Sequence, residues 1–443
     1  MRLKLVLLPL ALLAAACAAM AQSGAAPSFD LSAAMAKAVA NQPLILQAES
    51  VVAAARSRED EAKSAYLPNV SGAASYLYLY PQEGIDIPHL GSFNMTPLNM
   101  WDFHVAASEL VYDFGRREIQ VKLAESSVDA AAIGLDQIKT SIAFQTAQTF
   151  YSVIFLHEEL KVLDEQIATL EQHLNDTKLR EATGSSTHYD VLTTEVRVAS
   201  VRSQRIDAAG QYEKQRIALR ELLGLDSGAD FEVKGDFAPQ KPVPDDKAAV
   251  SAALSQRSDL AQSLAAEEQA ELGLNLARLG HMPTISAEVE AGYKNGLLTA
   301  ADSNVNDLLF NWNAGVMLNV PIFDSMLTER RGAEAGAKLA AARKGTDALR
   351  QSVTTQVLQA MQDVASNHDQ TANSLVQLDQ AQEALNMAKI QYDIGVGTNL
   401  EYLDSQTSLE LAKLSNLGAV FREVLSQLQL KQAMGEQIWK TAP

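Results

Sequence analysis

The chain has 443 residues, of which 47% are hydrophobic and 20% charged, and its formal net charge is −18. This hydrophobic content excludes an intrinsically disordered chain, because disordered chains lack the apolar surface needed for a core. The acidity argues against a nucleic-acid partner, since a DNA- or RNA-binding face must be basic.

Residues 1–21 have the pattern of a secretory signal peptide. A positively charged start precedes an apolar stretch, and small residues at Ala19 and Ala21 mark the expected cleavage site. The only cysteine, Cys17, lies inside this segment, so cleavage after Ala21 would leave no cysteine for a disulfide. A lipoprotein signal ending at Cys17 is the alternative, and the sequence does not decide whether this cysteine is lipidated.

Two kinds of element are expected after the signal segment. A helix is predicted over residues 31–66, and Pro68 ends it. Residues 69–81 then change to a period of two, which is typical of a strand. A loop rich in proline and glycine covers residues 81–99, and a second alternating stretch follows at residues 101–108.

The longest elements are predicted between Glu118 and Leu223, as a long helix, a turn at residues 183–187 and a returning helix. The first helix has 66 residues, or roughly 100 Å at about 1.5 Å per residue. Its apolar residues recur at alternating steps of three and four, which forms a heptad seam. The seam consists of Leu156, Leu160, Leu163, Ile167, Leu170 and Leu174.

The second half of the chain repeats this order, which indicates a duplicated half-protein. A helix is expected over residues 249–279, strands over 284–293 and 310–320, and a second long helix over 328–393. The halves align at an offset of 211 residues in the pairs Asp113–Asp324, Gly184–Gly395, Thr187–Thr398, Asp190–Glu401 and Leu192–Leu403. We therefore expect a signal peptide at 1–21, a first repeat at 22–225, a linker at 226–248, a second repeat at 249–437 and a tail at 438–443.

The four predicted strands are mostly apolar on one face and polar on the other, with aromatic residues near their ends. This pattern favours a transmembrane β-barrel, and two soluble amphipathic hairpins are the alternative. Outside the signal segment, no stretch reaches the roughly 18 consecutive apolar residues of a spanning helix. Four strands cannot close a barrel in lipid, so several chains must contribute, and three copies would supply about twelve strands.

Several motifs resemble those of the TolC-like outer-membrane efflux proteins, and the resemblance covers Phe29 to Gln437. The opening pattern contains Ala38, Asn41 and Pro43 and closes at Tyr66-Leu67-Pro68. The remaining motifs are Leu110 to Arg116 at a strand-to-helix exit, Leu219 to Leu225 at the end of a repeat, and Tyr392 to Gly395 followed by Glu401, Leu403 and Asp404.

The resemblance implies a mainly α-helical homotrimer in the outer membrane of a Gram-negative-type cell. Each chain is expected to give four strands to a 12-stranded β-barrel and two hairpins to a helical barrel in the periplasm. Its expected partners are a periplasmic adaptor, an inner-membrane pump of the RND, ABC or MFS type, and outer-membrane lipid. The resemblance does not name the exported substrate or the class of pump.

By the same resemblance, the turns of the two hairpins lie at the periplasmic end, where the channel closes. The residues expected at the gate are Tyr189, Asp190, Tyr392, Glu401 and Asp404. The turns expected to dock an adaptor contain Gly184, Ser185, Gly395, Val396 and Gly397. In a trimer, each gate carboxylate would become a ring of three, which selects cations and repels itself when closed.

Two observations at the tips leave alternatives open. Asp190, Glu401 and Asp404 all fall in the first turns of a helix, so they are also interpreted as ordinary solvated charges or charges that stabilise the helix dipole. Gly397 stands near the point where some relatives carry an arginine that ties the closed state. How the closed state would be held here is therefore not predicted.

The sequence lacks the spacing of known catalytic or phosphate-binding motifs, so we expect neither an enzyme nor a cofactor. Its seven histidines are scattered, and each is interpreted as a surface or interface residue rather than a metal ligand. We therefore predict a passive exit channel of a tripartite efflux pump or type I secretion system. The alternatives are a structural coiled-coil protein of the cell envelope and a periplasmic adaptor.

Overall fold

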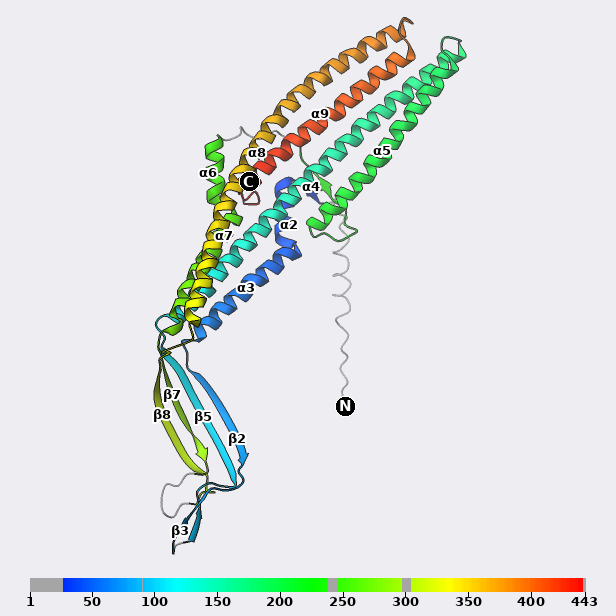
Figure 1. The fold of residues 1–443 in the computed structure, drawn as a ribbon. Helices are drawn as coiled ribbons and strands as arrows, with labels where there is room; N and C mark the ends of the chain where they lie inside the picture. The colour runs from blue at the N-terminus through cyan, green and yellow to red at the C-terminus, as the bar shows by residue number, and fades with distance from the viewer. Residues whose placement is uncertain (1–26, 90, 238–244, 297–303, 441–443) are drawn as a thin grey trace, which may run out of the picture. The chain divides into compact units, whose positions relative to one another are not determined.

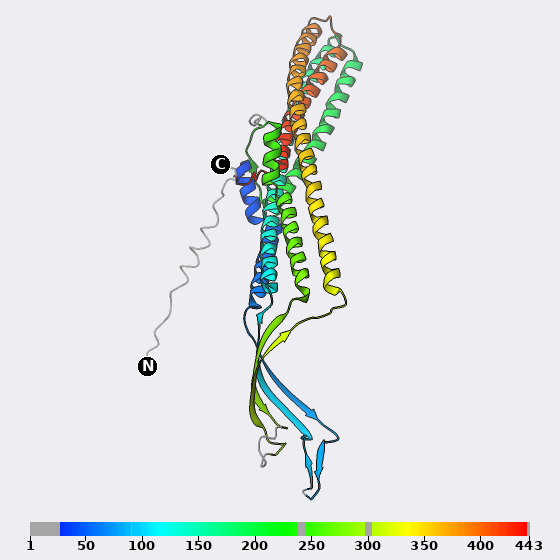
Figure 2. The same ribbon diagram turned by 60° about the vertical axis from the view of Figure 1, so that its left-hand side comes forward.

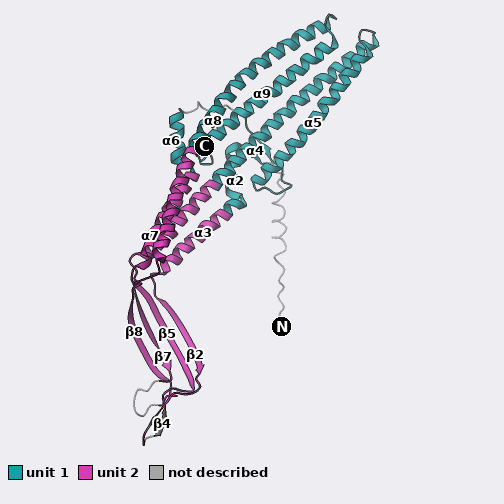
Figure 3. Ribbon diagram, in the orientation of Figure 1, with its two compact units in different colours: residues 1–46, 138–257, 353–443 teal, residues 47–137, 258–352 magenta. Residues whose placement is uncertain are grey.

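The computed structural model describes residues 27–89, 91–237, 245–296 and 304–440. It divides into two compact units (Figure 3), of which the first contains Met1–Leu46, Ile138–Arg257 and Val353–Pro443, and the second Gln47–Gln137 and Ser258–Ser352. The predicted signal peptide, with Cys17, lies outside the described residues. Residues 238–244 of the predicted linker do so as well.

Figure 1 shows the elements in chain order. The helices are α2 (Leu31–Asn41), α3 (Pro43–Ser64), α4 (Arg116–Ala182), α5 (His188–Leu222), α6 (Asp246–Gln256), α7 (Ser258–Arg278), η2 (Leu279–His281), α8 (Leu327–Asp393) and α9 (Asn399–Ala433). The strands are β1 (Ser28–Phe29), β2 (Asn69–Tyr78), β3 (Gly84–Ile87), β4 (Gly91–Asn94), β5 (Asn99–Tyr112), β6 (Glu232–Val233), β7 (Thr284–Lys294) and β8 (Leu309–Asn319). Among the described helices, none combines the length and apolar character needed to cross a membrane.

The two long helices agree closely with the prediction. Helices α4 and α8 each contain 67 residues, and the returning helices α5 and α9 each contain 35. Figures 1 and 2 show α4, α5, α8 and α9 side by side in the first unit. The predicted heptad seam lies inside, with Leu163 and Leu170 only 2% and 1% exposed. They pack with residues of α5, α8 and α9, among them Val198, Tyr392 and Leu403.

Four of the described strands form one antiparallel sheet of the second unit, in the order β2-β5-β7-β8. Paired residues of neighbouring strands lie on the same face of a sheet. On one face the rows are apolar and aromatic, for example Phe103 opposite Tyr293 and Tyr293 opposite Phe310. On the other face Asp102 pairs with Lys294, and Glu290 pairs with Asn313. The predicted alternation is therefore present in most rows of the sheet, and the row of Leu77 opposite Met100 on the polar face is an exception.

The stretch predicted as a proline- and glycine-rich loop at residues 81–99 contains a small hairpin. Strands β3 and β4 pair antiparallel, with Gly84 opposite Asn94 and Ile85 opposite Phe93. The Met95 amide also donates a hydrogen bond of 2.8 Å to the Glu83 carbonyl and extends this pairing. The loop prediction was wrong here because the alternating segment is only four residues long and is flanked by turn residues.

The two helices predicted over residues 31–66 and 249–279 are each interrupted, after Asn41 and after Gln256. In the first case the break precedes Pro43, which disfavours a helical conformation of Gln42. The Gln42 side chain donates hydrogen bonds to the carbonyls of Glu221 and Leu222 at the end of α5, both at 3.2 Å. The break therefore allows Gln42 to bind carbonyls at the end of α5, of which the Glu221 carbonyl also accepts a hydrogen bond of 3.0 Å from the Gly224 amide.

The second repeat uses the equivalent break for the same purpose. Arg257 has an extended backbone between α6 and α7, with ψ at 125°. Its Nη1 atom donates a hydrogen bond of 3.3 Å to the carbonyl of Ala433, the last residue of α9. No proline follows Arg257, so the sequence contains a weaker signal for this break than for the first.

The passage from sheet to long helix follows the predicted strand-to-helix motif. The Asp113 carboxylate accepts hydrogen bonds from the amides of Gly115, at 3.2 Å, and Arg117, at 2.8 Å. Gly115 has a φ of +87°, which favours glycine. In the second repeat, the Asp324 carboxylate likewise accepts a hydrogen bond of 2.8 Å from the Thr328 amide. Both aspartates therefore cap the first turn of a long helix.

Candidate functional site: the two hairpin tips

Helices α4 and α5 form the first hairpin, and α8 and α9 form the second. Their two turns, which we call the tips, have the same backbone geometry. Gly184 and Gly395 have φ values of +73° and +80°, the left-handed conformation that a tight helix reversal requires. The Ser185 amide donates to the Arg180 carbonyl at 2.8 Å, and the Val396 amide donates to the Gln391 carbonyl at 3.0 Å. Both turns therefore complete their own helix ends with local hydrogen bonds, as expected for glycine turns.

Asp190 and Glu401 occupy equivalent positions in the first turn of α5 and α9. The Asp190 carboxylate accepts hydrogen bonds from the Thr187 amide at 3.0 Å and the Thr187 hydroxyl at 2.7 Å. The Glu401 carboxylate accepts one from the Thr398 amide at 2.8 Å. The Asp190 and Glu401 amides donate back to the threonine hydroxyls, both at 3.2 Å, which makes each pair a capping box.

These contacts lower the pKa of both carboxyl groups. Partial burial of Asp190 opposes the shift, but hydrogen bonds from Thr187 and Ser186 outweigh it and lower the pKa of this residue. Hydrogen bonds from the Thr398 amide and hydroxyl lower the pKa of Glu401. Both side chains are therefore charged at neutral pH and are engaged within their own helix.

Near the tips, two ion pairs connect the first hairpin to the second, and a third, of Lys413 in α9 with Glu165 in α4 at 3.6 Å, lies farther from the turns. Arg180 of α4 approaches Asp393 at the end of α8, with Nη2 3.1 Å from Oδ1. Its guanidinium also lies 4.5 Å from the centre of the Tyr392 ring, a cation–π distance. Arg197 of α5 approaches Asp404 of α9, with Nη2 3.5 Å from Oδ1. In the two pairs near the tips the first hairpin supplies the cation and the second supplies the anion, whereas the Lys413–Glu165 pair has the opposite polarity.

A buried polar contact lies between the same hairpins. The Nε2 atom of His173 is 2.7 Å from the Asn399 Oδ1 atom, and His173 is 6% exposed. The Asn399 amide nitrogen is 3.3 Å from the Asp190 carbonyl oxygen and 3.4 Å from the Thr194 hydroxyl. Asn399 therefore joins α4 and α5 to the start of α9.

Burial lowers the pKa of His173 because the charged imidazolium loses solvation. The Tyr392 and Tyr402 rings lie against the imidazole, with centroids at 5.3 Å and 4.3 Å. Among charged groups, Asp176 and Asp393 favour the protonated form and Arg180 opposes it, but burial outweighs them. His173 is therefore neutral at neutral pH.

Although position 397 is a glycine and supplies no cation, an arginine of the first hairpin still contacts the second hairpin at this point. A Cβ atom at this position would lie 3.1 Å from both the Gln391 Cβ and the Tyr392 nitrogen, so a side chain would be crowded. The cation that contacts Tyr392 comes from Arg180 on the other hairpin. Its Nη1 atom donates a hydrogen bond of 3.4 Å to the Tyr392 carbonyl.

An apolar groove runs along α5 and α9 next to the tips. It is lined by Tyr189, Leu192, Thr193, Val196, Arg197, Ser200, Leu400 and Leu403. Tyr189 and Val196, which lie on the same face of α5 two helical turns apart, are 73% and 70% exposed in the single chain. The groove is therefore a candidate interaction surface.

The predicted gate residues thus fall into three environments. Asp190 and Glu401 cap helices, Tyr392 is buried, and Asp404 and Tyr189 face outward.

The sequence interpretation missed Arg180, and its placement of His173 at a surface or interface was wrong, because His173 is buried within the single chain. Both belong to a row with Gln166 at steps of seven residues, beside the leucine seam, and this row was the available signal.

A protein-family model described as outer membrane efflux protein matches residues 34–225 and 249–436. The chain belongs to the outer membrane efflux protein family. The outer membrane protein TolC of Vibrio cholerae is 23% identical to it over 403 residues, which cover 89% of this chain and 88% of TolC. The cobalt-zinc-cadmium resistance protein CzcC of Cupriavidus metallidurans is 25% identical over 331 residues, which cover 72% of this chain and 74% of CzcC.

Solved structures agree with this family assignment. A crystal structure of CusC superposes with a TM-score of 0.78 at 18% identity and covers 92% of both chains. This likeness shows the fold. The family resemblance, the fold class and the outer-membrane location predicted from the sequence are confirmed. As a member of this efflux family, the chain is an outer-membrane efflux channel protein.

Proposed function

We propose that this chain forms, as a homotrimer, the passive exit channel of a tripartite efflux pump or a type I secretion system. A periplasmic adaptor and an inner-membrane pump would complete the assembly and supply the energy. The observation that carries the proposal is the four-stranded sheet, which is apolar on one face and polar on the other. Three such sheets supply about twelve strands, within the usual range of outer-membrane barrels.

The exposure of the apolar face supports a lipid contact. Val316, Trp312 and Phe310 of β8 are 75%, 68% and 59% exposed in the single chain. Exposing such a surface to water is unfavourable by roughly 25 cal/mol per Å² of apolar area. Lipid would cover this face, while the polar face would line a water-filled channel that accepts substrates of different chemistry.

We infer that the tips form the periplasmic gate. Asp404 is the gate carboxylate best placed for this role, because it is largely exposed and contacts Arg197 across the hairpins. Opening would separate α9 from α5 and so break the Arg197–Asp404 contact. Tyr189 would line the approach, Tyr392 would anchor the second hairpin, and the charges of Asp190 and Glu401 would add to the acidic ring.

The exposed groove supports docking of an adaptor at the same end of the hairpins. The turns of Gly184, Ser185, Gly395, Val396 and Gly397 would present this groove to the helical tip of the adaptor. Leu192, Val196 and Leu400 would supply the apolar contact. An apolar groove of this kind suits the apolar face of an amphipathic helix.

Single-channel recording in planar bilayers tests the proposal. The wild-type protein is expected to give discrete, cation-selective steps, and Asp404→Ala is expected to give longer or larger openings. Glu195→Ala is the matched control, because Glu195 pairs with Lys178 at 2.7 Å within the first hairpin. Equal effects of both variants would remove Asp404 from the gate.

The same preparation distinguishes the alternatives. A protein that stays soluble without detergent and gives no conductance would contradict the channel and favour a coiled-coil envelope protein or an adaptor. A detergent-stable trimer without steps would require its adaptor for opening. Addition of the purified adaptor should then restore conductance, and failure to do so would contradict the proposal.

A further inference from the structure

The strand register brings an imidazole and two carboxylates together on the polar face of the sheet. Asp102 and His104 are two residues apart on β5, so their side chains lie on the same face. Glu290 of β7 pairs with Ala106, and His104 pairs with Gly292. Glu290 is therefore the diagonal neighbour of His104 across the two strands.

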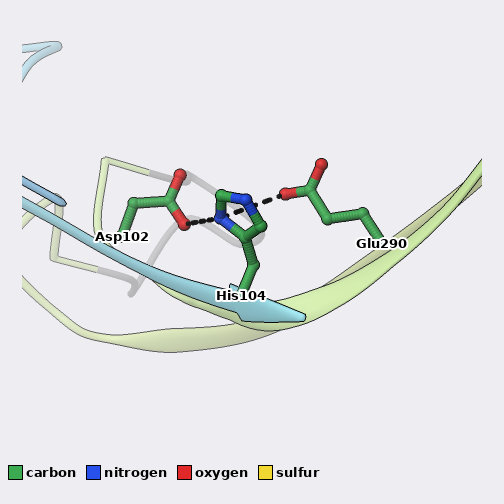
Figure 4. Close-up of side chains that lie close together, drawn as sticks. All are labelled: Asp102, His104 and Glu290. Atoms are coloured by element: carbon green, nitrogen blue, oxygen red, sulfur yellow. Dashed lines mark hydrogen bonds and ion pairs between the residues drawn. The ribbon is translucent and has the colours of Figure 1, made fainter. Parts of the chain in front are cut away.

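The distances within this group are short. The His104 Nδ1 atom lies 2.8 Å from Asp102 Oδ1 and 3.6 Å from Glu290 Oε1. Figure 4 shows the imidazole between the two carboxylates, one on its own strand and one on the neighbouring strand. One ligand atom from each residue lies within 4.8 Å of the others. The side chains of Asp102, His104 and Glu290 are 29%, 26% and 22% exposed, so an ion from solution can reach them.

Gly292 leaves the space that this arrangement needs. A Cβ atom at position 292 would lie 2.1 Å from the Phe103 carbonyl oxygen and 2.7 Å from the His104 Cβ. Any larger residue would therefore push β5 and β7 apart at this row. Without a side chain opposite it, the imidazole extends towards Glu290 on the neighbouring strand.

A neighbouring amide orients the second carboxylate. The Asn313 Nδ2 atom of β8 lies 3.4 Å from Glu290 Oε2, and the two residues pair across the sheet. This contact occupies one oxygen of Glu290 and leaves Oε1 facing His104. Three strands thus contribute to the group, two through the ligand atoms and one through the orienting amide.

We propose that Asp102, His104 and Glu290 form a binding site for a divalent transition-metal ion of the zinc type. One imidazole nitrogen and two carboxylate oxygens suit Zn²⁺, whereas Ca²⁺ and Mg²⁺ prefer oxygen ligands alone. Ligand bonds of about 2.0–2.2 Å place tetrahedral ligand atoms roughly 3.3 Å apart. The observed separations of 2.8 Å and 3.6 Å lie on either side of that value, and the shorter one is a hydrogen bond between His104 Nδ1 and Asp102 Oδ1.

Binding would require small side-chain rotations and replacement of the Nδ1 proton, with its hydrogen bond to Asp102, by the ion. The imidazole would carry its proton on Nε2 and present Nδ1 to the ion, and water would complete the coordination. The site rests on the register of the sheet and does not depend on which pump the channel serves. In a trimer it would occur three times, at one level of the barrel.

Cobalt(II) serves as the probe, because its visible absorption reports both occupancy and coordination geometry. We expect the full-length protein, purified in detergent and freed of metal, to bind one Co²⁺ per chain, and Zn²⁺ to displace it. His104→Gln and Glu290→Gln should abolish the absorption. Asn313→Ala should weaken binding by about 10- to 100-fold, as expected for a group that orients a ligand.

Glu288→Gln is the matched control, since Glu288 lies on the same face of the same strand but pairs with Ser108, away from His104. Size-exclusion chromatography would verify that each variant keeps the wild-type assembly. Binding that survives His104→Gln would overturn the proposal. An equal loss from Glu288→Gln and Glu290→Gln would also overturn it, because it would indicate a diffuse acidic surface.

Discussion

The two hairpin tips share a backbone but differ in the side chains that connect them. Both have a left-handed glycine, a capping box and an equivalent turn hydrogen bond, from the Ser185 or the Val396 amide, 211 residues apart. The connecting residues are not duplicated. Arg180 corresponds to Gln391 and Asp404 to Thr193 in the other repeat, and His173 corresponds to Ala384. The two repeats thus share the glycine and the capping box that form each turn, whereas the residues that connect the two hairpins differ between the repeats.

Among substitutions at the contact between the hairpins, we expect replacement of Asn399 to lower the stability of the tip most. Asn399→Ala would leave the buried His173 without its hydrogen-bond partner and cost about 1–3 kcal/mol in the local opening free energy of the tip. Hydrogen exchange of the tip amides measures this quantity. His188→Ala changes the corresponding residue of the first repeat, which is exposed, and should cost less than about 0.5 kcal/mol. Equal costs would contradict the asymmetry.

The shared backbone predicts equal effects at the two glycines. Gly184→Ala and Gly395→Ala should each destabilise the tip by roughly 1–2 kcal/mol, because alanine is strained at positive φ. No described atom lies within 4 Å of a Cβ built at either position, so the backbone alone sets the cost. Gly345→Ala, inside α8, is the control and should be neutral or stabilising. A difference between the tips in thermal unfolding would show that their turns are not equivalent.

The buried histidine predicts a pH dependence that the two capping carboxylates do not share. Because burial lowers the pKa of His173, its contribution to stability is complete above the unfolded pKa of about 6.5. That contribution is lost as the pH falls below this value towards the lowered pKa of the folded state. The lowered pKa values of Asp190 and Glu401 preserve their contributions until far more acidic pH.

Tip exchange between pH 7.5 and 5.5, corrected for intrinsic rates, should therefore increase in the wild type. His173→Asn keeps a hydrogen-bonding side chain but does not titrate, so its exchange should stay constant over this range. An unchanged pH dependence in this variant would assign the effect to another group.

The smallest effect is expected for the exposed ion pair of Arg197 and Asp404. Exposed pairs typically contribute about 0.2–1 kcal/mol, and salt screens them. A double-mutant cycle of Arg197→Ala and Asp404→Ala, measured at low and high salt, would give this coupling energy. A coupling that persists at high salt would indicate that neighbouring chains bury the pair.

The sequence contained strong signals for the long helices and their turns. The leucine seam and the glycines are local signals, and the turn motif occurs again 211 residues later. Helices α4, α5, α8 and α9 could therefore be predicted from the sequence. The breaks at Gln42 and Arg257 were missed because their purpose lies elsewhere. Each side chain satisfies carbonyls of a helix that is more than 170 residues away in the sequence.

The contacts between the tips could not be predicted for a similar reason. His173 and Asn399 are 226 residues apart, and their meeting depends on how two hairpins align along their length. The group of Asp102, His104 and Glu290 depends on strand register, since a shift by one residue would turn Glu290 to the other face. None of these residues belongs to a sequence motif that would have indicated its contacts.

The self-contained turns have a consequence for how such proteins diversify. Each turn satisfies its helix ends with bonds made inside the segment from Arg180 to Asp190, or from Gln391 to Glu401. The backbone of each turn can therefore tolerate side-chain changes, provided that Arg180 and Asn399 keep their contacts with the other hairpin. Outward-facing side chains of the turns can then diversify while α4, α5, α8, α9 and the four-stranded sheet keep their fold.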